Sequence, residues 1–460
     1  MSGTTTTITL NGQQQHALDL IHGWYAMEHL GGHSATAVRT KPWYALGGYA
    51  GSGKTTLLPI ILRTLNIDPE RCLIGTPTAA AARRGPEKLL AAGMGMCFCS
   101  TLHSVFMTPF PPDPEAELAE LREAEAALSE EPKDIALQAA VKRAEAAYRH
   151  ELEVEVHFGP NGTDMSDTHD LFVIDEFSML NKNDLNIILS HNVPVLLFGD
   201  PAQLQVVEGE PAITSPDYTL TQVMRQANGS AILPVAAQFR AGKMPYRTPH
   251  VYGPGASVHT LRSFRKTYGC EPREFIDDEV VHLFVMNNDR RAFNVAARQA
   301  LGYGTPYPVI GDRMVCKLNS VDKDLKGALP NSDLVRAASD LDMTRLHGHE
   351  NARKAPMSIV HDSGFGARTM VISNVWVNAF SEFYDPADPK FTAPEKGGKS
   401  KRPSHGSVEI FDYAYGLTVH AAQGSEWPVA VVHMCGGWLP KSFLYTAATR
   451  AQEELIILWH

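Results

Sequence analysis

The sequence predicts an α/β protein with two domains, each built on a doubly wound, mostly parallel sheet. Two observations lead to this fold class. Short apolar runs end in glycine or a carboxylate and are followed by helix-like patterns, first within residues 43–62 and then around 170–180 and 193–207. A similar pattern returns around residues 413–434. Alternating strand–loop–helix units of this kind form parallel sheets covered by helices.

Composition places the chain among ordinary soluble proteins. Its 460 residues, 44% of them apolar and 20% charged, suffice for about three domains. Apolar runs stay shorter than the ~18 residues of a membrane span, and "MSGTTTTITL" lacks a signal-peptide core. With only six cysteines, which we interpret as reduced thiols, a cytoplasmic location is expected.

Charge excludes one class of protein. The net charge of −10 has the wrong sign for a protein that coats nucleic acid indiscriminately. Residues 262–298 are nevertheless rich in arginine, and residues 396–406 are basic and glycine-rich. Each stretch is either a binding surface or a solvated surface, and composition does not decide between them.

The stretch "WYALGGYAGSGKTTLLPIIL", residues 43–62, predicts a phosphate-binding loop between a buried strand and a helix. Glycines let the backbone approach an anion, and amide groups at the helix start point toward it. We expect Lys54 to neutralise the β- and γ-phosphate oxygens and Thr55 to place its hydroxyl on Mg²⁺. The loop residues expected to contact the nucleotide are Gly48, Ala50, Gly51, Ser52, Gly53, Lys54, Thr55 and Thr56.

Two carboxylates follow the apolar run Leu171–Ile174. Because open α/β sheets bind ligands at the carboxyl ends of their strands, Asp175 and Glu176 are expected near the phosphate. Asp175 suits Mg²⁺, usually through water, and Glu176 suits the orientation and deprotonation of an attacking water. The pair therefore favours hydrolysis over phosphate transfer.

A further apolar run, in "VPVLLFGDPAQLQVV", ends in Gly199 and Asp200 and then offers the amide of Gln203. A neutral amide beside the γ-phosphate reports its presence without changing the local charge. The alternative is an ordinary strand-end turn in which Asp200 caps the next element.

Two arginines are candidates to stabilise charge on a transferring phosphoryl group. Arg225 lies in a segment, residues 221–240, predicted to be helical, and Arg450 precedes a short apolar strand. Either arginine is by default a surface residue. If both instead reach the nucleotide from a second α/β domain, hydrolysis changes how tightly two bodies close.

The segment "YAYGLTVHAAQGSEWPVAVVHM" places several polar side chains in a loop before a strand. Their hydrogen-bonding groups suit phosphate or sugar oxygens. These residues are Thr418, His420, Gln423, Gly424 and Ser425.

Taken together, these segments resemble the superfamily-one DNA helicases, particularly the 5′-to-3′ branch that includes the RecD subunit and the phage Dda-type helicases. The matching segments follow the family order over nearly the whole chain. They are "LNGQQQHAL" (10–18), "GYAGSGKT" (48–55), "GTPTAAAA" (75–82), "STLHS" (100–104), "VIDEFSM" (173–179), "GDPAQL" (199–204), "LTQVMRQA" (220–227), "YGLTVHAAQGSEW" (415–427) and "YTAATRA" (445–451).

The resemblance implies a role for each matching residue. Gln14 would read adenine, and Gly424 and Glu426 would complete the nucleotide site. The residues implied in binding and hydrolysis of MgATP are Lys54, Thr55, Asp175, Glu176 and Gln203, with Arg225 and Arg450 as paired arginine fingers. The residues implied in contacts with the backbone of single-stranded DNA are Thr78, Thr101, His103, Thr418, His420 and Gln423.

The resemblance also implies an ATP-dependent DNA helicase that moves 5′-to-3′ on single-stranded DNA and opens duplex at a fork. It implies two RecA-like motor domains, a monomeric motor, and a role in replication or recombination in a bacterial or phage-infected cytoplasm. The alternative is an ATP-gated DNA-binding or loading ATPase that does not unwind processively. Ala421 favours the alternative because the family usually has a cation there.

Two insertions interrupt the predicted motor domains. Residues 112–156, with thirteen acidic and five basic residues, predict an antiparallel helical hairpin that is either structural or a docking site for a protein partner. Phe158 beyond it is either a strand-separating wedge or a packed loop residue. Residues 369–380 favour a small, SH3-like β-barrel in the second insertion, whereas residues 332–346 predict a helix there.

These expectations divide the chain into four parts. They are a first RecA-like domain (1–107 and 165–220), a helical-hairpin insertion (108–164), a second RecA-like domain (221–312 and 408–460) and an inserted accessory subdomain (313–407).

Overall fold

The computed structural model describes most of the chain, and every structural statement below concerns those residues. They are residues 10–29, 41–78, 81–82, 97–110, 115–130, 134–153, 157–206, 209–223, 229–317, 329, 331–346, 354–362, 367–376, 380, 409–436 and 439–460.

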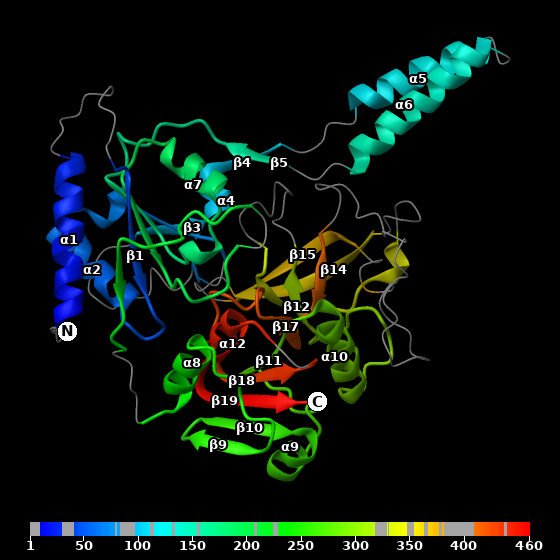
Figure 1. Cartoon of the computed structure of the whole chain (residues 1–460). Helices are drawn as coiled ribbons and strands as arrows, with labels where there is room; N and C mark the ends of the chain where they lie inside the picture. Colours follow the sequence, from blue (N-terminus) through cyan, green and yellow to red (C-terminus); the bar gives the residue numbers. More distant parts are fainter. Residues whose placement is uncertain are drawn as a thin grey trace. The chain divides into compact units, whose positions relative to one another are not determined.

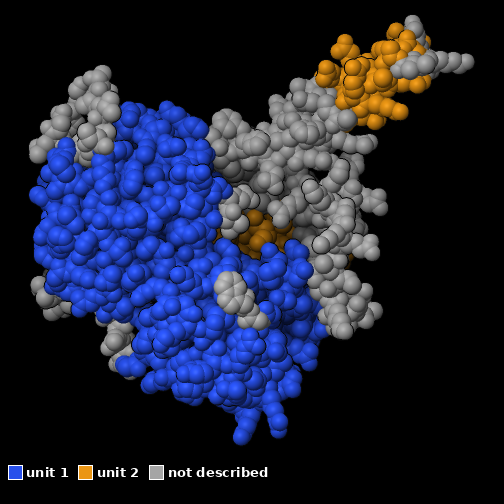
Figure 2. Space-filling view, in the orientation of Figure 1, with its two compact units in different colours: residues 1–107, 160–304, 413–460 blue, residues 108–159, 305–412 orange. Residues whose placement is uncertain are grey.

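The chain forms two compact units (Figure 2). Unit 1 comprises residues 1–107, 160–304 and 413–460, and unit 2 comprises residues 108–159 and 305–412. Unit 1 contains two six-stranded sheets, which confirms the predicted pair of RecA-like domains. The finer division predicted from the sequence, with boundaries near residues 107, 164, 220, 312 and 407, stays a prediction.

The first sheet of unit 1 is parallel between all its neighbouring strands. Its strands lie in the order β3-β2-β6-β7-β1-β8. Chain order and spatial order therefore differ, as in doubly wound folds. The strands are β1 (Trp43–Gly48), β2 (Cys72–Thr76), β3 (Phe98–Thr101), β6 (Leu171–Ile174), β7 (Val195–Gly199) and β8 (Tyr218–Leu220).

Alternate strand residues form the core beneath two helices. Because side chains of a strand alternate between faces, Tyr44 and Leu46 of β1 point to the same side as Leu196 and Phe198 of β7. That side is covered by α1 (Gly12–His29) and by α2 (Lys54–Thr64), which runs helically through Pro59. Each fully buried Leu or Ile there contributes about 1.5–3 kcal/mol of transfer free energy.

The second sheet of unit 1 has the order β17-β11-β18-β19-β10-β9 (Figure 1). Its strands are parallel except for the edge strand β9, which is antiparallel to β10. The strands are β9 (His250–Gly253), β10 (Ala256–Thr260), β11 (Val280–Phe284), β17 (Gly416–Thr418), β18 (Trp427–Met434) and β19 (Ala451–Trp459).

The remaining helices of unit 1 are short. They are α4 (Leu102–Phe106), α7 (Lys182–Leu189), α8 (Ile232–Arg240), α9 (Leu261–Tyr268), α10 (Asn287–Ala300) and α12 (Lys441–Ala448), with the 3₁₀ turns η1 (Pro69–Arg71) and η2 (Phe177–Met179). Of the helix predicted over residues 221–240, residues 232–240 are helical, and residues 224–228 lie outside the described residues. Residues 221–223 and 229–231 are not helical, so α8 starts only where a regular apolar face begins, at Ile232.

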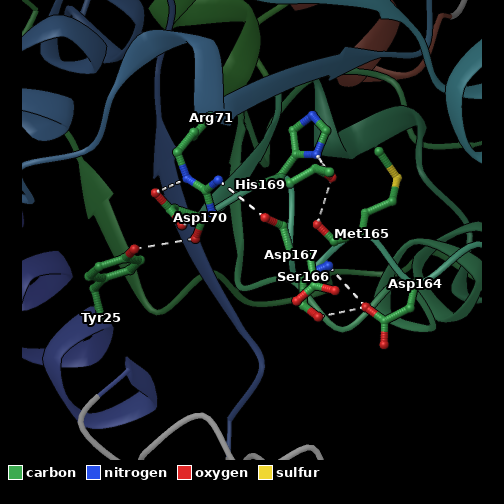
Figure 3. Close-up of polar contacts among 9 residues, drawn as sticks. Tyr25, Arg71, Asp164, Met165, Ser166, Asp167, His169 and Asp170 are labelled. Carbon is green, nitrogen blue, oxygen red and sulfur yellow. Dashed lines mark hydrogen bonds and ion pairs between the residues drawn. The ribbon is translucent and has the colours of Figure 1, made fainter.

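Hydrogen bonds at the amino ends of β2 and β6 fix where β6, the strand that leads to Asp175 and Glu176, begins (Figure 3). The Arg71 guanidinium donates to both carboxylate oxygens of Asp170, at 2.8 and 2.7 Å, and to the Asp167 carbonyl at 3.2 Å. Tyr25 of α1 donates to the Asp170 carbonyl at 3.3 Å. A slip of β6 by one residue would break this pairing, so the network holds the residues at the far end of β6 in place.

Unit 2 contains a helical hairpin and a small sheet. The hairpin, α5 (Glu115–Glu130) and α6 (Ile135–Glu153), confirms the predicted insertion and is drawn in cyan and green-cyan in Figure 1. The two-stranded sheet of β4 (Met107–Phe110) and β5 (His157–Pro160) flanks it in sequence.

The second insertion folds as a five-stranded sheet, β15-β14-β13-β12-β16. A bridge between Val375 in β15 and Glu409, just before β16, joins the two edge strands as in a small barrel. The strands are β12 (Arg313–Cys316), β13 (Leu334–Ala337), β14 (Lys354–Asp362), β15 (Ala367–Trp376) and β16 (Phe411–Tyr413).

The helix predicted over residues 332–346 was wrong. Residues 334–337 are strand β13 and only Met343–Arg345 (η3) turn helically. β13 pairs antiparallel with both β12 and β14, and Val335 and Ala337 are buried while their neighbours are partly exposed. Tertiary pairing thus outweighs local helix propensity.

Among the described residues, no helix is long and apolar enough to span a bilayer.

Candidate active site

The phosphate loop leaves β1 and enters α2. Gly53, at φ 84°, adopts a left-handed conformation that suits glycine, and no side chain caps the first turn of α2. The Lys54 ammonium donates to the carbonyl of Gly48 and, at 3.5 Å, to that of Tyr49. The amides at the start of α2 and the Lys54 charge therefore belong to one loop, as anion binding requires.

Gln14, the predicted adenine reader, contacts this loop. Its side-chain amide donates to the Ser52 carbonyl at 3.2 Å, and its oxygen accepts from the Asn11 amide at 3.1 Å. A Cβ added at Gly53 would lie 2.7 Å from the Gln14 amide nitrogen. Helix α1 thus packs directly on the phosphate loop.

Three neighbouring strands of the first sheet carry the predicted polar residues at their carboxyl ends. The order β6-β7-β1 places Asp175 and Glu176, Asp200 and the phosphate loop along one sheet edge. Glu176 sits in the left-handed region, at φ 60° and ψ 48°, and the Asp175 carboxylate accepts from its amide at 2.9 Å. Such strained backbone in a residue other than glycine is common at functional sites.

Burial, followed by the charge of Asp175, raises the pKa of Glu176 above its usual value. The positive charges of Arg450 and Lys54 oppose this rise. Glu176 therefore lies within electrostatic reach of the phosphate-loop lysine and of an arginine that follows α12. A carboxyl with a raised pKa is the type of group that accepts a proton from water.

Residues after β17 and in α12 bind to the loop that follows β7. The Leu204 amide donates to the Thr446 hydroxyl at 3.0 Å, and the Gln423 side chain donates to the Leu204 carbonyl at 3.1 Å. Tyr445 accepts from the Ala50 amide at 3.0 Å and donates to the Asp200 carboxylate at 2.5 Å. The two sheets of unit 1 are thus joined by hydrogen bonds at the edge that carries the phosphate loop.

Arg450 is 3% exposed and is held by its own domain. Its guanidinium donates to the Thr446 carbonyl at 3.1 Å, the Ser425 carbonyl at 3.0 Å and the Thr449 hydroxyl at 3.0 Å. These bonds orient a permanent cation, whose positive charge opposes the rise in the pKa of Glu176.

The chemistry of this edge fits a nucleotide phosphate and a magnesium ion. In the described part of the chain, the buried atoms Ser52 Oγ and Gln203 Oε1 have no hydrogen-bond partner. Burial of such an atom costs about 1–3 kcal/mol, so each is poised for a ligand atom. The Thr55 hydroxyl and the Asp175 carboxylate are the hard oxygen ligands that Mg²⁺ prefers.

The predicted DNA-contacting residues differ in exposure. Thr78, Thr101 and Gln423 are 5%, 8% and 2% exposed, so each has little surface for a ligand. Thr418, His103 and His420 are partly exposed. Burial lowers the pKa of both histidines, although nearby Asp184 opposes the shift at His103.

Of the last predicted residues, the structure describes Gly424 and Glu426. Gly424, at φ 77°, packs so closely that an added Cβ would lie 2.4 Å from the Thr78 hydroxyl. The Glu426 carboxylate accepts from Gln452 at 3.2 Å. Arg225 and the side chain of Phe158 lie outside the described residues, so their predicted roles stay predictions.

Sequence reasoning missed two residues that touch the phosphate loop. Arg240 of α8 stacks on the Tyr49 ring, with 3.4 Å between the guanidinium carbon and the ring centroid. Tyr445 lies five positions before Arg450, inside the segment "YTAATRA". The segment itself was the available signal for Tyr445, whereas nothing in the sequence around Arg240 points to the loop.

Comparisons with known proteins agree with this architecture. A family model described as an AAA domain matches residues 33–262, half of the chain, and one described as a UvrD-like helicase C-terminal domain matches residues 413–458. The fold is similar to that of a Pif1 helicase from Bacteroides in complex with ADP-AlF3 and single-stranded DNA, at TM-score 0.51 and 17% identity over 98% of this chain and 92% of that one. It is also similar to Pif1 helicases on forked double-stranded DNA, at TM-score 0.50 and 18% identity over the same shares.

Proposed function

The chain belongs to the superfamily 1B helicases, ATP-hydrolysing DNA helicases, and from this premise we propose that it moves 5′-to-3′ along single-stranded DNA and unwinds duplex. The direction rests on the family alone, since no residue pattern encodes it. The two Pif1 structures of similar fold contain single-stranded DNA and forked DNA, which supports the same partners here.

One observation carries this proposal. Hydrogen bonds join the second sheet domain to the phosphate loop and to the loop after β7: Tyr445 and Thr446 accept from the Ala50 and Leu204 amides, and Gln423 donates to the Leu204 carbonyl. Both loops belong to the nucleotide-binding edge of the first sheet. A change at the terminal phosphate therefore alters groups that the second domain holds, which is how hydrolysis becomes relative movement of two bodies.

We assign the chemistry as follows. Lys54 neutralises the phosphates, Thr55 and Asp175 hold Mg²⁺, and Glu176 orients and deprotonates the attacking water. Gln203 senses the terminal phosphate through its side-chain NH2, which can donate to a phosphate oxygen, and its unpartnered buried oxygen can accept from the attacking water. Arg450, together with Arg225, stabilises the charge that develops on the transferring group, and Gln14, Gly424 and Glu426 complete the nucleotide site.

DNA contacts are assigned to partly exposed residues first. His103 and His420 are neutral at pH 7 because burial lowers their pKa values, so they donate or accept hydrogen bonds without adding charge. Thr418 adds a hydroxyl. We expect these contacts to hold the sugar–phosphate backbone and to tolerate any base sequence.

The acidic hairpin α5–α6 does not suit a DNA track because its carboxylates repel phosphate. It is either a structural arm or a docking site for a basic protein partner. The motor itself is proposed to work as a monomer.

The test uses two partial duplexes of equal length, one with a 5′ single-stranded tail and one with a 3′ tail. We expect ATP-dependent strand release from the 5′-tailed duplex only, with Glu176→Gln as the control that binds ATP without cleaving it. Release from the 3′-tailed duplex would overturn the direction. DNA-stimulated hydrolysis without release from either would favour an ATP-gated loading protein instead.

A further inference from the structure

Two side chains of the second sheet domain contact adjacent residues of the phosphate loop. Tyr445, in α12, binds the Ala50 amide, and Arg240, at the end of α8, stacks on the ring of Tyr49. Helices α8 and α12 pack against each other, so both contacts come from one rigid pair of helices. Neither Tyr445 nor Arg240 is among the residues to which the proposed function assigns chemistry.

The Tyr445 hydroxyl links three elements. It accepts from the Ala50 amide at 3.0 Å and donates to Asp200 at 2.5 Å, and Asp200 also accepts from the Ala202 amide at 3.0 Å. Tyr445 and Asp200 are 2% and 0% exposed. Burial and the Asp200 carboxylate raise the pKa of Tyr445, so the hydroxyl keeps its proton and remains the donor.

Arg240 makes a second contact beside the first. Its guanidinium carbon lies 3.4 Å from the centroid of the Tyr49 ring and 5.8 Å from that of Tyr445. A planar guanidinium at this distance gains both stacking and cation–π energy. Arg240 thus lies between the ring of Tyr49, in the phosphate loop, and the ring of Tyr445, which binds the Ala50 amide.

These contacts have a geometric consequence for hydrolysis. The same helix, α12, ends just before Arg450, and Thr446 of α12 binds the Leu204 amide next to Gln203. Any displacement of α12 from the loop therefore moves the Arg450 cation and the Gln203 amide relative to the phosphates. Errors of about 1 Å in such positions are enough to slow a reaction strongly.

We propose that Tyr445 and Arg240 are positioning residues for ATP hydrolysis, which dock α12 onto residues 49–50 of the phosphate loop and so set the place of Arg450. This rests on the proposed function, because it assumes that the loop holds ATP. Neither side chain is assigned a contact with the nucleotide. Their loss should lower kcat and leave the KM for ATP almost unchanged.

Tyr445→Phe tests the hydroxyl alone, because phenylalanine keeps the buried ring. We expect kcat of DNA-stimulated ATP hydrolysis to fall about tenfold, the equivalent of one net hydrogen bond, while KM for ATP changes by less than about threefold. Tyr268→Phe is the matched control. Tyr268, in α9, donates to the Glu454 carboxylate of β19 at 2.8 Å and, among the described residues, has no contact with the phosphate loop, so the kcat of this variant should stay at the wild-type value.

Arg240 has a matched control of its own. Arg247 stacks on Trp459 with 5.2 Å between the guanidinium carbon and the ring centroid, on the edge of the second sheet. We expect Arg240→Ala to lower kcat about fivefold, Arg240→Lys to recover only part of it, and Arg247→Ala to leave it unchanged. The Arg240 and Arg247 variants therefore test the positioning role even if Tyr445→Phe melts at a much lower temperature than the wild type.

The outcomes separate this inference from the proposed function. A wild-type protein without DNA-stimulated hydrolysis would overturn both. Two outcomes would overturn the positioning role alone, provided that the wild type hydrolyses ATP. One is an unchanged kcat in Tyr445→Phe and Arg240→Ala, and the other is a fall in kcat that the control variants share. A rise in KM with unchanged kcat would also overturn it, because it would mean that the two residues serve nucleotide binding.

Discussion

Arg450→Ala is the change whose consequences the structure defines most fully. The guanidinium donates hydrogen bonds to Thr446, Ser425 and Thr449 at 3.1, 3.0 and 3.0 Å, and Arg450 is 3% exposed. With about 1 kcal/mol of net free energy per bond, alanine should lower the free energy of unfolding by roughly 3 kcal/mol. For a domain of this size the corresponding fall in Tm is roughly 6–12 °C.

The catalytic effect should be larger than the effect on stability. Loss of an arginine that stabilises transition-state charge in this reaction class lowers kcat by about 10³-fold or more. Arg450→Lys keeps the positive charge but loses the planar guanidinium that hydrogen-bonds to Thr446, Ser425 and Thr449. The kcat of this variant should therefore lie between those of the wild type and the alanine variant. Affinity for single-stranded DNA should be unchanged in both, because the buried guanidinium is turned toward its own domain.

The assay is steady-state ATP hydrolysis with saturating oligothymidine, at a temperature where melting curves show each variant to be folded. An alanine variant that melts several degrees lower but hydrolyses ATP at the wild-type rate would contradict the reasoning. Arg450 would then be a structural residue, and the second domain would supply no cation to the reaction.

Further predictions concern the first sheet. Glu176→Gln should bind ATP with wild-type affinity and hydrolyse it at least about 10²-fold more slowly, as measured by equilibrium binding and steady-state rates. Burial and Asp175 raise the pKa of Glu176, and the carboxylate form is the base, so as the pH falls kcat should begin to drop at a pH above the usual range for glutamate. Arg450→Ala removes a positive charge that opposes the rise in this pKa, so the acid limb should move to still higher pH. A profile with its acid limb at or below the ordinary glutamate pKa would contradict this. Gly199→Ala would bring a Cβ to 2.6 Å from the Phe177 ring, so it should lower the free energy of unfolding by about 1–3 kcal/mol and slow hydrolysis by displacing the neighbouring Glu176. Thermal melting checks the first effect, and unchanged activity would refute the second.

Much of the fold follows from local patterns in the sequence. The phosphate loop, the strand before Asp175 and the strand before Asp200 are each encoded within about a dozen residues, because apolar runs and strand-end polar residues are short-range signals. The parallel arrangement then places their carboxyl ends together.

The parts that sequence reasoning missed depend on distant contacts. Tyr445 and Ala50 are separated by 395 positions, and no local pattern records that their groups form a hydrogen bond. Strand β13 was predicted as a helix because residues 332–346 have a helix-like pattern, whereas its two neighbouring strands decide its conformation. Gln423, predicted on the DNA track from its motif, is buried against Leu204 because the two sheet domains meet there.

In the proposed mechanism, two sheet domains enclose one nucleotide, and loss of its terminal phosphate shifts one domain against the other. A crystal structure of the chain with ADP–aluminium fluoride, Mg²⁺ and oligothymidine tests it most directly. We expect the Lys54 ammonium and the Arg450 guanidinium to contact the fluoride together, each at about 3 Å. A fluoride contacted by the first domain alone, with Arg450 still turned to its own backbone, would contradict this mechanism.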